Sequence, residues 1–360
     1  MTLGATPIVT VNAATLSVGG PIGGGFGLIK SGVGTLTLSG SNTYTGTTSI
    51  NAGTLQIGNA GTTGALATTS VITGSAGGTL AFSCTDTVTQ GTHFNSVIGG
   101  AINLTQAGSG TLVLNQANTY TGTTSIDAGT LALTGSAGSI ANSSMIRVGS
   151  AGSSAAVLDL TSKTGTVAFT SSQTVGGIGT IQMGAGATAQ FAGILAPGNS
   201  AGVLTFDGGT ALLSGTTQIE IFGGTRGTGY DAVDLINSAA IDYGNSVLAL
   251  DFGLWLADEQ TYQLFGNGSA TLLADFSALS IDGTNYSGLT FTGSSGVWTS
   301  QGTSPSGQTL TFTTSTGTLV IVPESATVTL AGLGIAAAAY ALRRTLASRS
   351  TSGGSRAKQA

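Results

Sequence analysis

A long internal duplication constrains the fold of this chain more than any other feature. Residues 34–58 read GTLTLSGSNTYTGTTSINAGTLQIG, and residues 110–134 read GTLVLNQANTYTGTTSIDAGTLALT. The match extends without a gap over residues 22–57 and 98–133, so the copies lie 76 residues apart. Within each copy, the tripeptide Gly-Thr-Leu recurs after 19 residues. A unit of about 20–25 residues that restarts in this way is typical of a solenoid, whose repeats pack only on their neighbours.

Each restart alternates polar and apolar residues, which is the period of a β-strand with one buried face. The apolar pairs that follow Gly-Thr are Leu36/Leu38, Leu55/Ile57, Leu80/Phe82, Leu112/Leu114 and Leu131/Leu133. If each Gly-Thr-Leu strand lies above the last, the leucines stack about 4.8 Å apart, and Leu36, Leu55 and Leu80 form one column. At the tight corners between strands we expect a positive φ at Gly40, Asn42, Gly46 and Gly53.

The alternation continues in less regular form to residue 321, and no convincing helical period occurs before residue 326. The composition requires a buried core, because 40% of the residues are hydrophobic and only 6% are charged, against roughly 25% charged in typical soluble domains. A β-sandwich or a β-propeller would need regular hairpins or blades of about 40–50 residues. The sequence therefore favours a parallel β-helix.

Residue types that carry catalysis or bind cofactors are scarce. Cys84 is the single cysteine and fits a small buried side chain. His93 is the single histidine, so no Cys/His cluster exists, and we expect it in a turn or on the surface. The glycine clusters at 19–27 and 223–229 lack the Gly-Lys-Ser/Thr of a phosphate loop and fit corners of the coil. We expect no cofactor and no metal.

The charges are distributed unevenly along the chain. Residues 1–342 hold all fourteen acidic residues and only four basic ones, whereas the last eighteen residues hold five basic residues and no acid. An acidic body argues against nucleic-acid binding, because little in it would neutralise phosphates. A basic tail is typical of a membrane-anchored chain whose tail stays in the cytoplasm. The first basic residue is Lys30, so we expect a signal peptide, if one exists, upstream of Met1.

The duplicated unit GxGTLTLSGxNTYTGTTxIxAGTLxxG resembles the autotransporter-associated β-strand repeat, also called the passenger-associated transport repeat. Residues 172–180 (SQTVGGIGT) and 195–206 (LAPGNSAGVLTF) are also similar to stretches of autotransporter passenger stalks. This resemblance implies a right-handed parallel β-helix that is exported to the cell surface. It does not imply a catalytic activity.

The C-terminal region resembles a PEP-CTERM sorting signal. The Pro-Glu motif corresponds to Val322, Pro323, Glu324 and Ser325. The short transmembrane helix of the signal corresponds to residues 326–342, and its basic membrane stop corresponds to Arg343 and Arg344. The resemblance implies processing by an exosortase-type membrane enzyme, although Ser325 stands where that family usually has a second proline. A helix of this length reaches roughly 26 Å, at the short end of a membrane span. The alternative is a C-terminal helix that caps the solenoid.

These features predict four regions. Residues 1–141 form the clear repeats, and residues 142–321 continue as a less regular β-solenoid or β-rich region. Residues 322–344 form the sorting signal with its single transmembrane helix, and residues 345–360 form a basic cytoplasmic tail.

Two further groups are weak candidates for ligand contact. Asp231, Asp234 and Asp242 form the densest acidic set; they could be solvated loop acids, Ca²⁺ ligands, or the paired acids of a glycoside hydrolase. Tyr44 and Tyr120 occupy equivalent repeat positions, and their alternatives are an aromatic ladder for sugar binding or packing at a strand end.

The sequence favours a non-enzymatic, exported protein of the cell surface or extracellular matrix, structural or adhesive in role, with glycans as possible partners. One alternative is a polysaccharide-active or polysaccharide-binding β-helix protein. The other is a capped intracellular solenoid without a membrane role.

Overall fold

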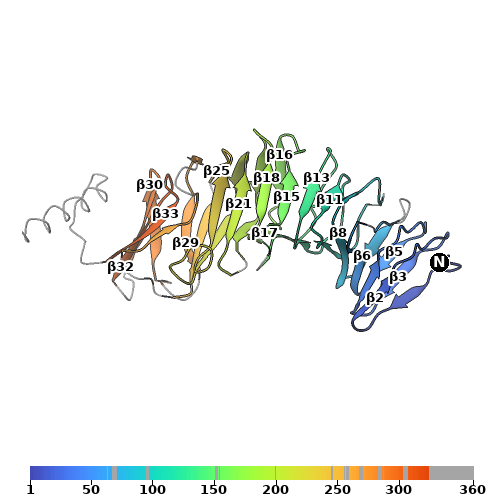
Figure 1. Ribbon diagram of the computed structural model, residues 1–360. Coiled ribbons are helices and arrows are strands. Elements are labelled where there is room, and N and C mark those ends of the chain that lie inside the picture. Colours follow the sequence, from blue (N-terminus) through green and yellow to red (C-terminus); the bar gives the residue numbers. More distant parts are fainter. Residues whose placement is uncertain are drawn as a thin grey trace, which may run out of the picture. The chain divides into compact units, whose positions relative to one another are not determined.

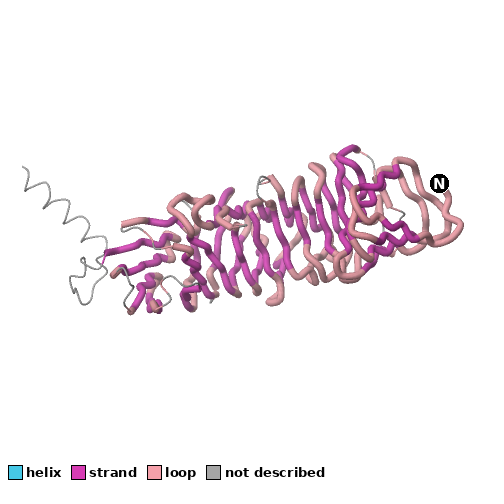
Figure 2. The backbone as a smooth tube through the Cα atoms, turned by 90° about the horizontal axis from the view of Figure 1, so that it is seen from below, coloured by secondary structure: helices cyan, strands magenta, loops and turns pink. Residues whose placement is uncertain are grey.

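A computed structural model describes residues 1–323 except 63, 67–70, 95–96, 151–152, 154, 199, 245, 255, 257–258, 267–270, 283–285, 287 and 303–306 (Figure 1). These described residues form strands and loops without a helix (Figure 2), so the all-β prediction is confirmed for them. None of them belongs to a helix long and apolar enough to cross a membrane. The predicted transmembrane helix at 326–342 and the basic tail lie outside the described residues.

Four parallel sheets make up most of this region. The largest contains β2 (Thr15–Val18), β4 (Thr35–Leu38), β6 (Gly53–Gly61), β8 (Gly78–Cys84), β10 (Asn103–Gln106), β12 (Thr124–Ile126), β14 (Met145–Val148), β17 (Thr174–Gly177), β20 (Ile194–Pro197), β23 (Thr216–Ile221), β26 (Val247–Phe252) and β29 (Ala278–Asp282). Figure 1 shows its strands following one another in chain order from β2 to β29.

The other three parallel sheets supply the remaining sides of the coils. One contains β1 (Ile8–Thr10), β3 (Leu28–Ser31), β5 (Thr48–Ile50) and β7 (Ile72–Gly74). The second contains β9 (Thr87–Thr89), β11 (Thr111–Leu114), β13 (Thr130–Leu133), β15 (Val157–Leu160), β18 (Thr180–Met183), β21 (Val203–Asp207) and β24 (Ala232–Ile236). The third contains β16 (Thr166–Phe169), β19 (Thr188–Phe191), β22 (Thr210–Leu213), β25 (Ala240–Asp242) and β28 (Thr271–Leu273).

The expected leucine column is present. Leu36 pairs with Leu55, and Leu55 pairs with Leu80, in register across three parallel strands. All three side chains are at most 1% exposed. One strand cannot cover its own apolar face, so each layer is buried by the layers beside it. Parallel strands therefore stack as expected for a β-helix, while its right-handed sense stays a prediction.

The corner prediction is only partly correct. Gly53 has a φ of 66°, but Gly40, Asn42 and Gly46 do not have positive φ. Gly40 and Gly46 meet a different requirement, because a Cβ at either position would lie within 3 Å of backbone atoms of the neighbouring coil. Glycine is needed at these two corners for close approach between layers rather than for backbone freedom.

Asn42 fixes its corner by bonding to the layers on both sides. Its Oδ1 accepts a hydrogen bond from the N–H of Ile22 at 3.0 Å, and its Nδ2 donates to the carbonyl of Ala65 at 2.8 Å. In the second copy, Asn118 bonds in the same way to Ile98 and Ser139. Buried backbone groups at a corner must find partners, and the repeated asparagine supplies them.

Equivalent strands of the two copies lie in different sheets, contrary to the expectation that every Gly-Thr-Leu strand lies above the last. Leu80 on β8 pairs with Leu55 below it and with Leu104 above it, although Leu104 is equivalent to Leu28 rather than to Leu55. The next Gly-Thr-Leu strand, β11, instead pairs with β9, which begins a new sheet. We call this change the β8 handover. The strand β9, which lies between β8 and β10 in the chain, is the first strand of that new sheet.

The last strands depart from the expected parallel solenoid. β30 (Thr290–Ser294), β31 (Val297–Gln301), β32 (Gln308–Thr313), β33 (Thr318–Pro323) and β27 (Thr261–Gln263) form an antiparallel sheet. We call it the closing sheet. Phe312 of this sheet packs with its ring centroid 5.9 Å from that of Phe276 and 6.2 Å from that of Phe265. The closing sheet therefore covers the apolar end of the last coils.

Candidate functional surface

The buried acid Asp231 is not the solvated loop acid that composition suggested. It is 2% exposed, just before β24. Its Oδ1 accepts a hydrogen bond from the N–H of Gly202 at 2.9 Å, and its Oδ2 accepts one from the N–H of Glu220 at 3.0 Å. Burial raises the pKa of Asp231 to about 8, although the two N–H donors oppose the shift, and the Glu220 carboxylate adds to it. Asp231 thus fixes two chain segments rather than facing solvent.

This burial predicts that stability falls as the pH rises. Between about pH 4 and pH 8 the folded Asp231 retains a proton that the unfolded chain has released, so the folded state is favoured at the acidic end. One such group contributes a slope of at most about 1.4 kcal/mol per pH unit. We expect urea denaturation of the Asp231→Asn variant to show a weaker pH dependence than the wild type over this range.

Gln218→Ala is the control, because Gln218 lies on β23 beside Glu220 and does not titrate. It should keep the pH dependence of the wild type. If the free energy of unfolding depended on pH equally in Asp231→Asn and in the wild type, Asp231 would not be the group responsible.

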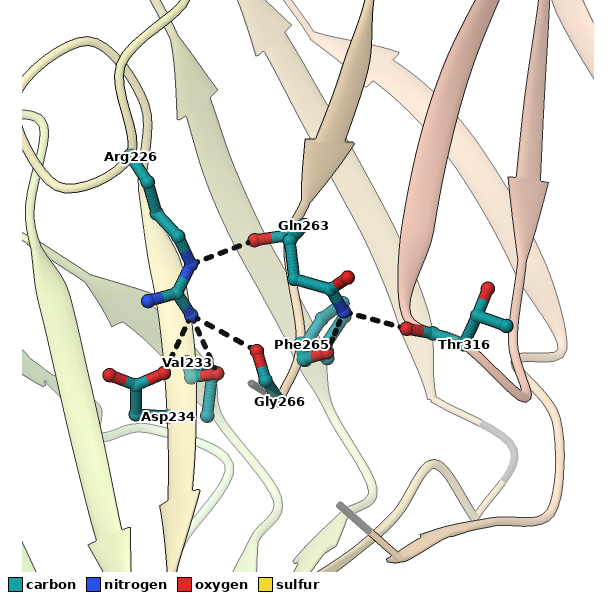
Figure 3. Close-up of polar contacts among 7 residues, drawn as sticks. All are labelled: Arg226, Val233, Asp234, Gln263, Phe265, Gly266 and Thr316. Atoms are coloured by element: carbon teal, nitrogen blue, oxygen red, sulfur yellow. Dashed lines mark hydrogen bonds and ion pairs between the residues drawn. The ribbon is translucent and has the colours of Figure 1, made fainter. Parts of the chain in front are cut away.

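Asp234 has a different partner from Asp231. Its Oδ1 lies 2.8 Å from the Nη2 atom of Arg226 (Figure 3). The guanidinium also donates to the backbone carbonyls of Gln263, Val233 and Gly266, at 3.1, 3.3 and 3.3 Å. Asp234 therefore orients an arginine that connects the loop at 223–229 to β24, to the end of β27 and to Gly266 after it. The arrangement is structural.

Figure 3 also shows how this contact continues into the closing sheet. The Nε2 atom of Gln263 donates to the carbonyls of Phe265 and Thr316, at 2.6 Å each. Thr316 lies in the turn between β32 and β33. We call Arg226, Asp234 and Gln263 the end lock, because they join the last parallel strands to the closing sheet.

Removing the guanidinium should loosen this end. We expect Arg226→Ala to lower the free energy of unfolding by about 1–3 kcal/mol, because three carbonyls and one carboxylate lose a charged donor; the 27% exposure of the arginine side chain keeps the value below that of a buried ion pair. The measurement is chemical denaturation.

Arg226→Lys is the matched control for this prediction. It keeps the charge but loses the fork that reaches several acceptors at once, so it should recover only part of the loss. Full recovery by lysine would show that charge alone matters.

The three aspartates that the sequence singled out do not meet at one site. Asp242 lies at the end of β25, and its Oδ1 accepts a hydrogen bond from the N–H of Gly244 at 3.0 Å. Asp231, Asp234 and Asp242 thus have separate partners. Within the part of the chain that the structure describes, no group of three or more His, Cys, Asp or Glu side chains is arranged to hold a metal ion. The geometry gives no support to Ca²⁺ binding or to paired catalytic acids at these positions.

Of the two alternatives for Tyr44 and Tyr120, packing is confirmed and the aromatic ladder for sugar binding is wrong. Both side chains are at most 1% exposed. The hydroxyl groups bond to those of Thr48 and Thr124, at 2.8 and 2.6 Å. The two tyrosines therefore pack inside the coil and cannot contact a sugar.

The single Cys and His lie as expected. Cys84 is 3% exposed on β8, where burial raises the pKa of its thiol. His93 lies in a turn, and its Nδ1 accepts a hydrogen bond from the N–H of Thr89 at 2.9 Å.

Lys30 is a buried residue whose role the sequence did not reveal. Its Nζ donates to the carbonyls of Ser31, Gly32 and Ala52, at 2.9, 2.7 and 3.0 Å. The equivalent residue of the second copy is Gln106, whose Nε2 donates to Gly108 at 2.8 Å. Both copies thus place a long side chain with a hydrogen-bond donor inside the corner. Alignment of the two copies, which sets Lys30 opposite Gln106, could have shown that this position needs such a donor.

The outer surface carries columns of threonine. Thr15, Thr35, Thr54 and Thr79 pair in register on the largest sheet. Thr87, Thr111 and Thr130 form a second column. These are the threonines of the Gly-Thr-Leu strands and their neighbours, and the adjacent leucines point inward. The coils therefore present hydroxyl groups at the spacing of the strands, about 4.8 Å.

Comparison with known proteins agrees with this repeat architecture. Residues 28–57 and 104–133 match the family model of the passenger-associated-transport-repeat. The resemblance seen in the sequence is thus confirmed for these two segments, which begin at β3 and at β10. The matched residues include both Tyr–Thr pairs and both corner asparagines.

One relative is the protein named Adhesin BmaC autotransporter of Brucella suis biovar 1 (strain 1330). It is 32% identical over an alignment of 139 residues, and the match covers 36% of this chain. The chain spans 4% of the length of that relative.

Proposed function

We propose that this chain is an exported, non-enzymatic surface protein whose β-solenoid serves as an adhesive or structural scaffold. The observation that carries the proposal is the stacking of two passenger-associated-transport-repeats into coils whose outer columns bear threonine. The similarity to a protein named as an adhesin supports the same role. Regular hydroxyl groups offer weak contacts to glycans, and many weak contacts in parallel produce useful avidity.

The second part of the proposal is C-terminal sorting. Val322 and Pro323 form the end of β33, where they pair with Thr309 and Gln308; Glu324 and Ser325 lie outside the described residues. The first two residues of the motif thus belong to the last strand of the closing sheet. We infer that residues 326–342 anchor the chain in the membrane, with Arg343 and Arg344 on the cytoplasmic side, until an exosortase-type enzyme processes it.

The test is mass spectrometry of the mature C-terminus, combined with cell fractionation, in a host that has an exosortase. The wild type should be recovered outside the cytoplasm, ending near residues 323–325. Glu324→Ala should retain Ala360 and accumulate in the membrane fraction. Glu259→Ala, which also removes one carboxylate, is the control and should be processed normally. Full-length protein in the cytosol would contradict export.

Adhesion is tested separately. Cells that display the protein should bind a glycan-coated surface more strongly than cells lacking it, and the glycans should remain intact. Release of new reducing ends would instead favour a polysaccharide-active enzyme.

A further inference from the structure

An open strand edge lies in the middle of the solenoid. β16 is the first strand of its sheet and pairs only with β19, from Thr166 with Thr188 to Phe169 with Phe191. On the other side of β16 the structure gives it no partner strand among the described residues. An unpaired edge presents a row of free N–H and C=O groups that another strand can join.

The pairing shows which groups are free. The N–H of Thr188 donates to the carbonyl of Gly165, and the N–H of Ala192 donates to the carbonyl of Phe169. Because the hydrogen-bonding direction alternates along a strand, Val167 and Phe169 face β19, whereas the N–H and C=O of Thr166 and Ala168 face away from it. Both Thr166 and Ala168 are exposed.

A groove runs along this free edge. Its volume is about 460 Å³, which is within the range of small-ligand sites. Its walls include all four residues of β16 and the loop residues Gly135, Ser136 and Gly138. A Cβ added at Gly135 would meet nothing within 4 Å. The groove is therefore open at Gly135.

Lys163 supplies the charge of this groove. No other lining residue is charged. Its Nζ donates to the carbonyl of Gly135 at 2.7 Å, so the ammonium group connects two residues that line the groove. A carboxylate would be a better partner for this group than a neutral carbonyl.

We propose that the groove binds an extended, acidic peptide segment of a partner protein, which adds a strand to the free edge of β16. The N–H and C=O groups of Thr166 and Ala168 would pair with the peptide backbone, as in other cases of strand addition. A carboxylate of the peptide would contact Lys163. The small residues of the opposite wall leave room for its side chains. This inference depends on the groove alone and not on the proposed surface role.

The first test uses full-length protein and an array of fluorescein-labelled hexapeptides that alternate threonine and valine and carry one glutamate at each position in turn. Fluorescence anisotropy should identify binding peptides, and replacing the glutamate by glutamine should weaken them about threefold, as expected for an exposed ion pair. Every second amide of an extended peptide faces the same side. N-methylation of the set that faces β16 should abolish binding, because it removes the donors to that strand, whereas N-methylation of the other set should not.

The decisive variant is Ala168→Pro. Proline is tolerated on an edge strand where the N–H faces solvent, so the fold should survive while the donor to the peptide is lost. We expect at least tenfold weaker binding. Ala168→Val keeps the N–H and is the matched control, with binding within about twofold of the wild type. Lys163→Met should remove the difference between glutamate and glutamine peptides.

Hydrogen exchange gives a readout that does not require the proline variant to fold. The amides of Thr166 and Ala168 should exchange rapidly in the free protein and become protected when the peptide binds, whereas those of Val167 and Phe169 should be protected throughout. The proposal is overturned if no peptide binds at about 1 mM, or if binding leaves Thr166 and Ala168 unprotected. It is also overturned if an oligouronide occupies the groove and the peptides do not.

Discussion

Replacing Leu55 by alanine should lower the free energy of unfolding by about 3–5 kcal/mol. Leu55 is fully buried between Leu36 and Leu80, in the column that joins β4, β6 and β8. Truncation of a buried leucine costs about 2–5 kcal/mol, and the upper part of this range applies where the surroundings cannot collapse into the cavity. The backbones of stacked strands are held by their ladders, so little collapse is possible here. Urea denaturation followed by circular dichroism measures the loss.

Thr54→Ala is the control for this substitution. Thr54 lies on the same strand, on the outer face, and pairs with Thr35 and Thr79. Its truncation should change the free energy of unfolding by less than about 1 kcal/mol. If both variants lost similar amounts of the free energy of unfolding, burial of the leucine column would not be the main source of stability in these coils.

Replacing Gly129 by alanine should cost a similar amount, about 2–5 kcal/mol, for two separate reasons. The residue has a φ of 60°, and a left-handed conformation costs roughly 1–2 kcal/mol for a residue with a Cβ. The added Cβ would also lie within 3 Å of the carbonyl oxygens of Gly108 and Gly110 on the neighbouring coil, and overpacking costs typically 1–3 kcal/mol. Thermal or chemical denaturation would show the sum.

A substitution at Gly135 separates the cost of the left-handed conformation from the cost of overpacking. Its φ of 62° is almost the same, but a Cβ there would meet nothing within 4 Å. Gly135→Ala should therefore cost only the conformational part. If both alanine variants were equally stable, close packing between layers would not be the reason for glycine at position 129.

The strand period predicted the inward set of residues well. Leu36, Leu55 and Leu80 stack as the repeat spacing indicated, because a parallel ladder in register follows directly from a repeat with fixed corners. The position of Leu112 was not predicted. It pairs with Val88 instead of continuing that column, because the β8 handover depends on one additional strand whose local sequence pattern is ordinary.

The antiparallel closing sheet was missed for a related reason. Leu310 and Phe312 alternate with threonine as the strands of the parallel sheets do. An alternating strand reads the same in both orientations, so the pattern cannot distinguish them. Only the contacts of β32 with β31 and β33 decide the direction.

The candidate site was predicted least well. The burial of Asp231 depends on donors at Gly202 and Glu220, which are distant in sequence. The edge of β16 is likewise free because no described strand pairs with it on that side, and the residues of β16 itself do not indicate this. Short patterns indicate which face of a strand is buried, but they do not indicate what lies beside it.

The β8 handover lies wholly within one 76-residue interval, between β6 and its equivalent, β13. Recombination between the two copies would remove residues 58–133 and join Ile57 to Thr134, so that β6 would be followed by β14 and β15 just as β13 is now. β14 and β15 now pair with β12 and β13, and after the deletion they would meet the equivalent strands β5 and β6 instead. We therefore expect deletion or duplication of this 76-residue block to leave the packing of the remaining coils intact, because the repeats contact only their neighbours.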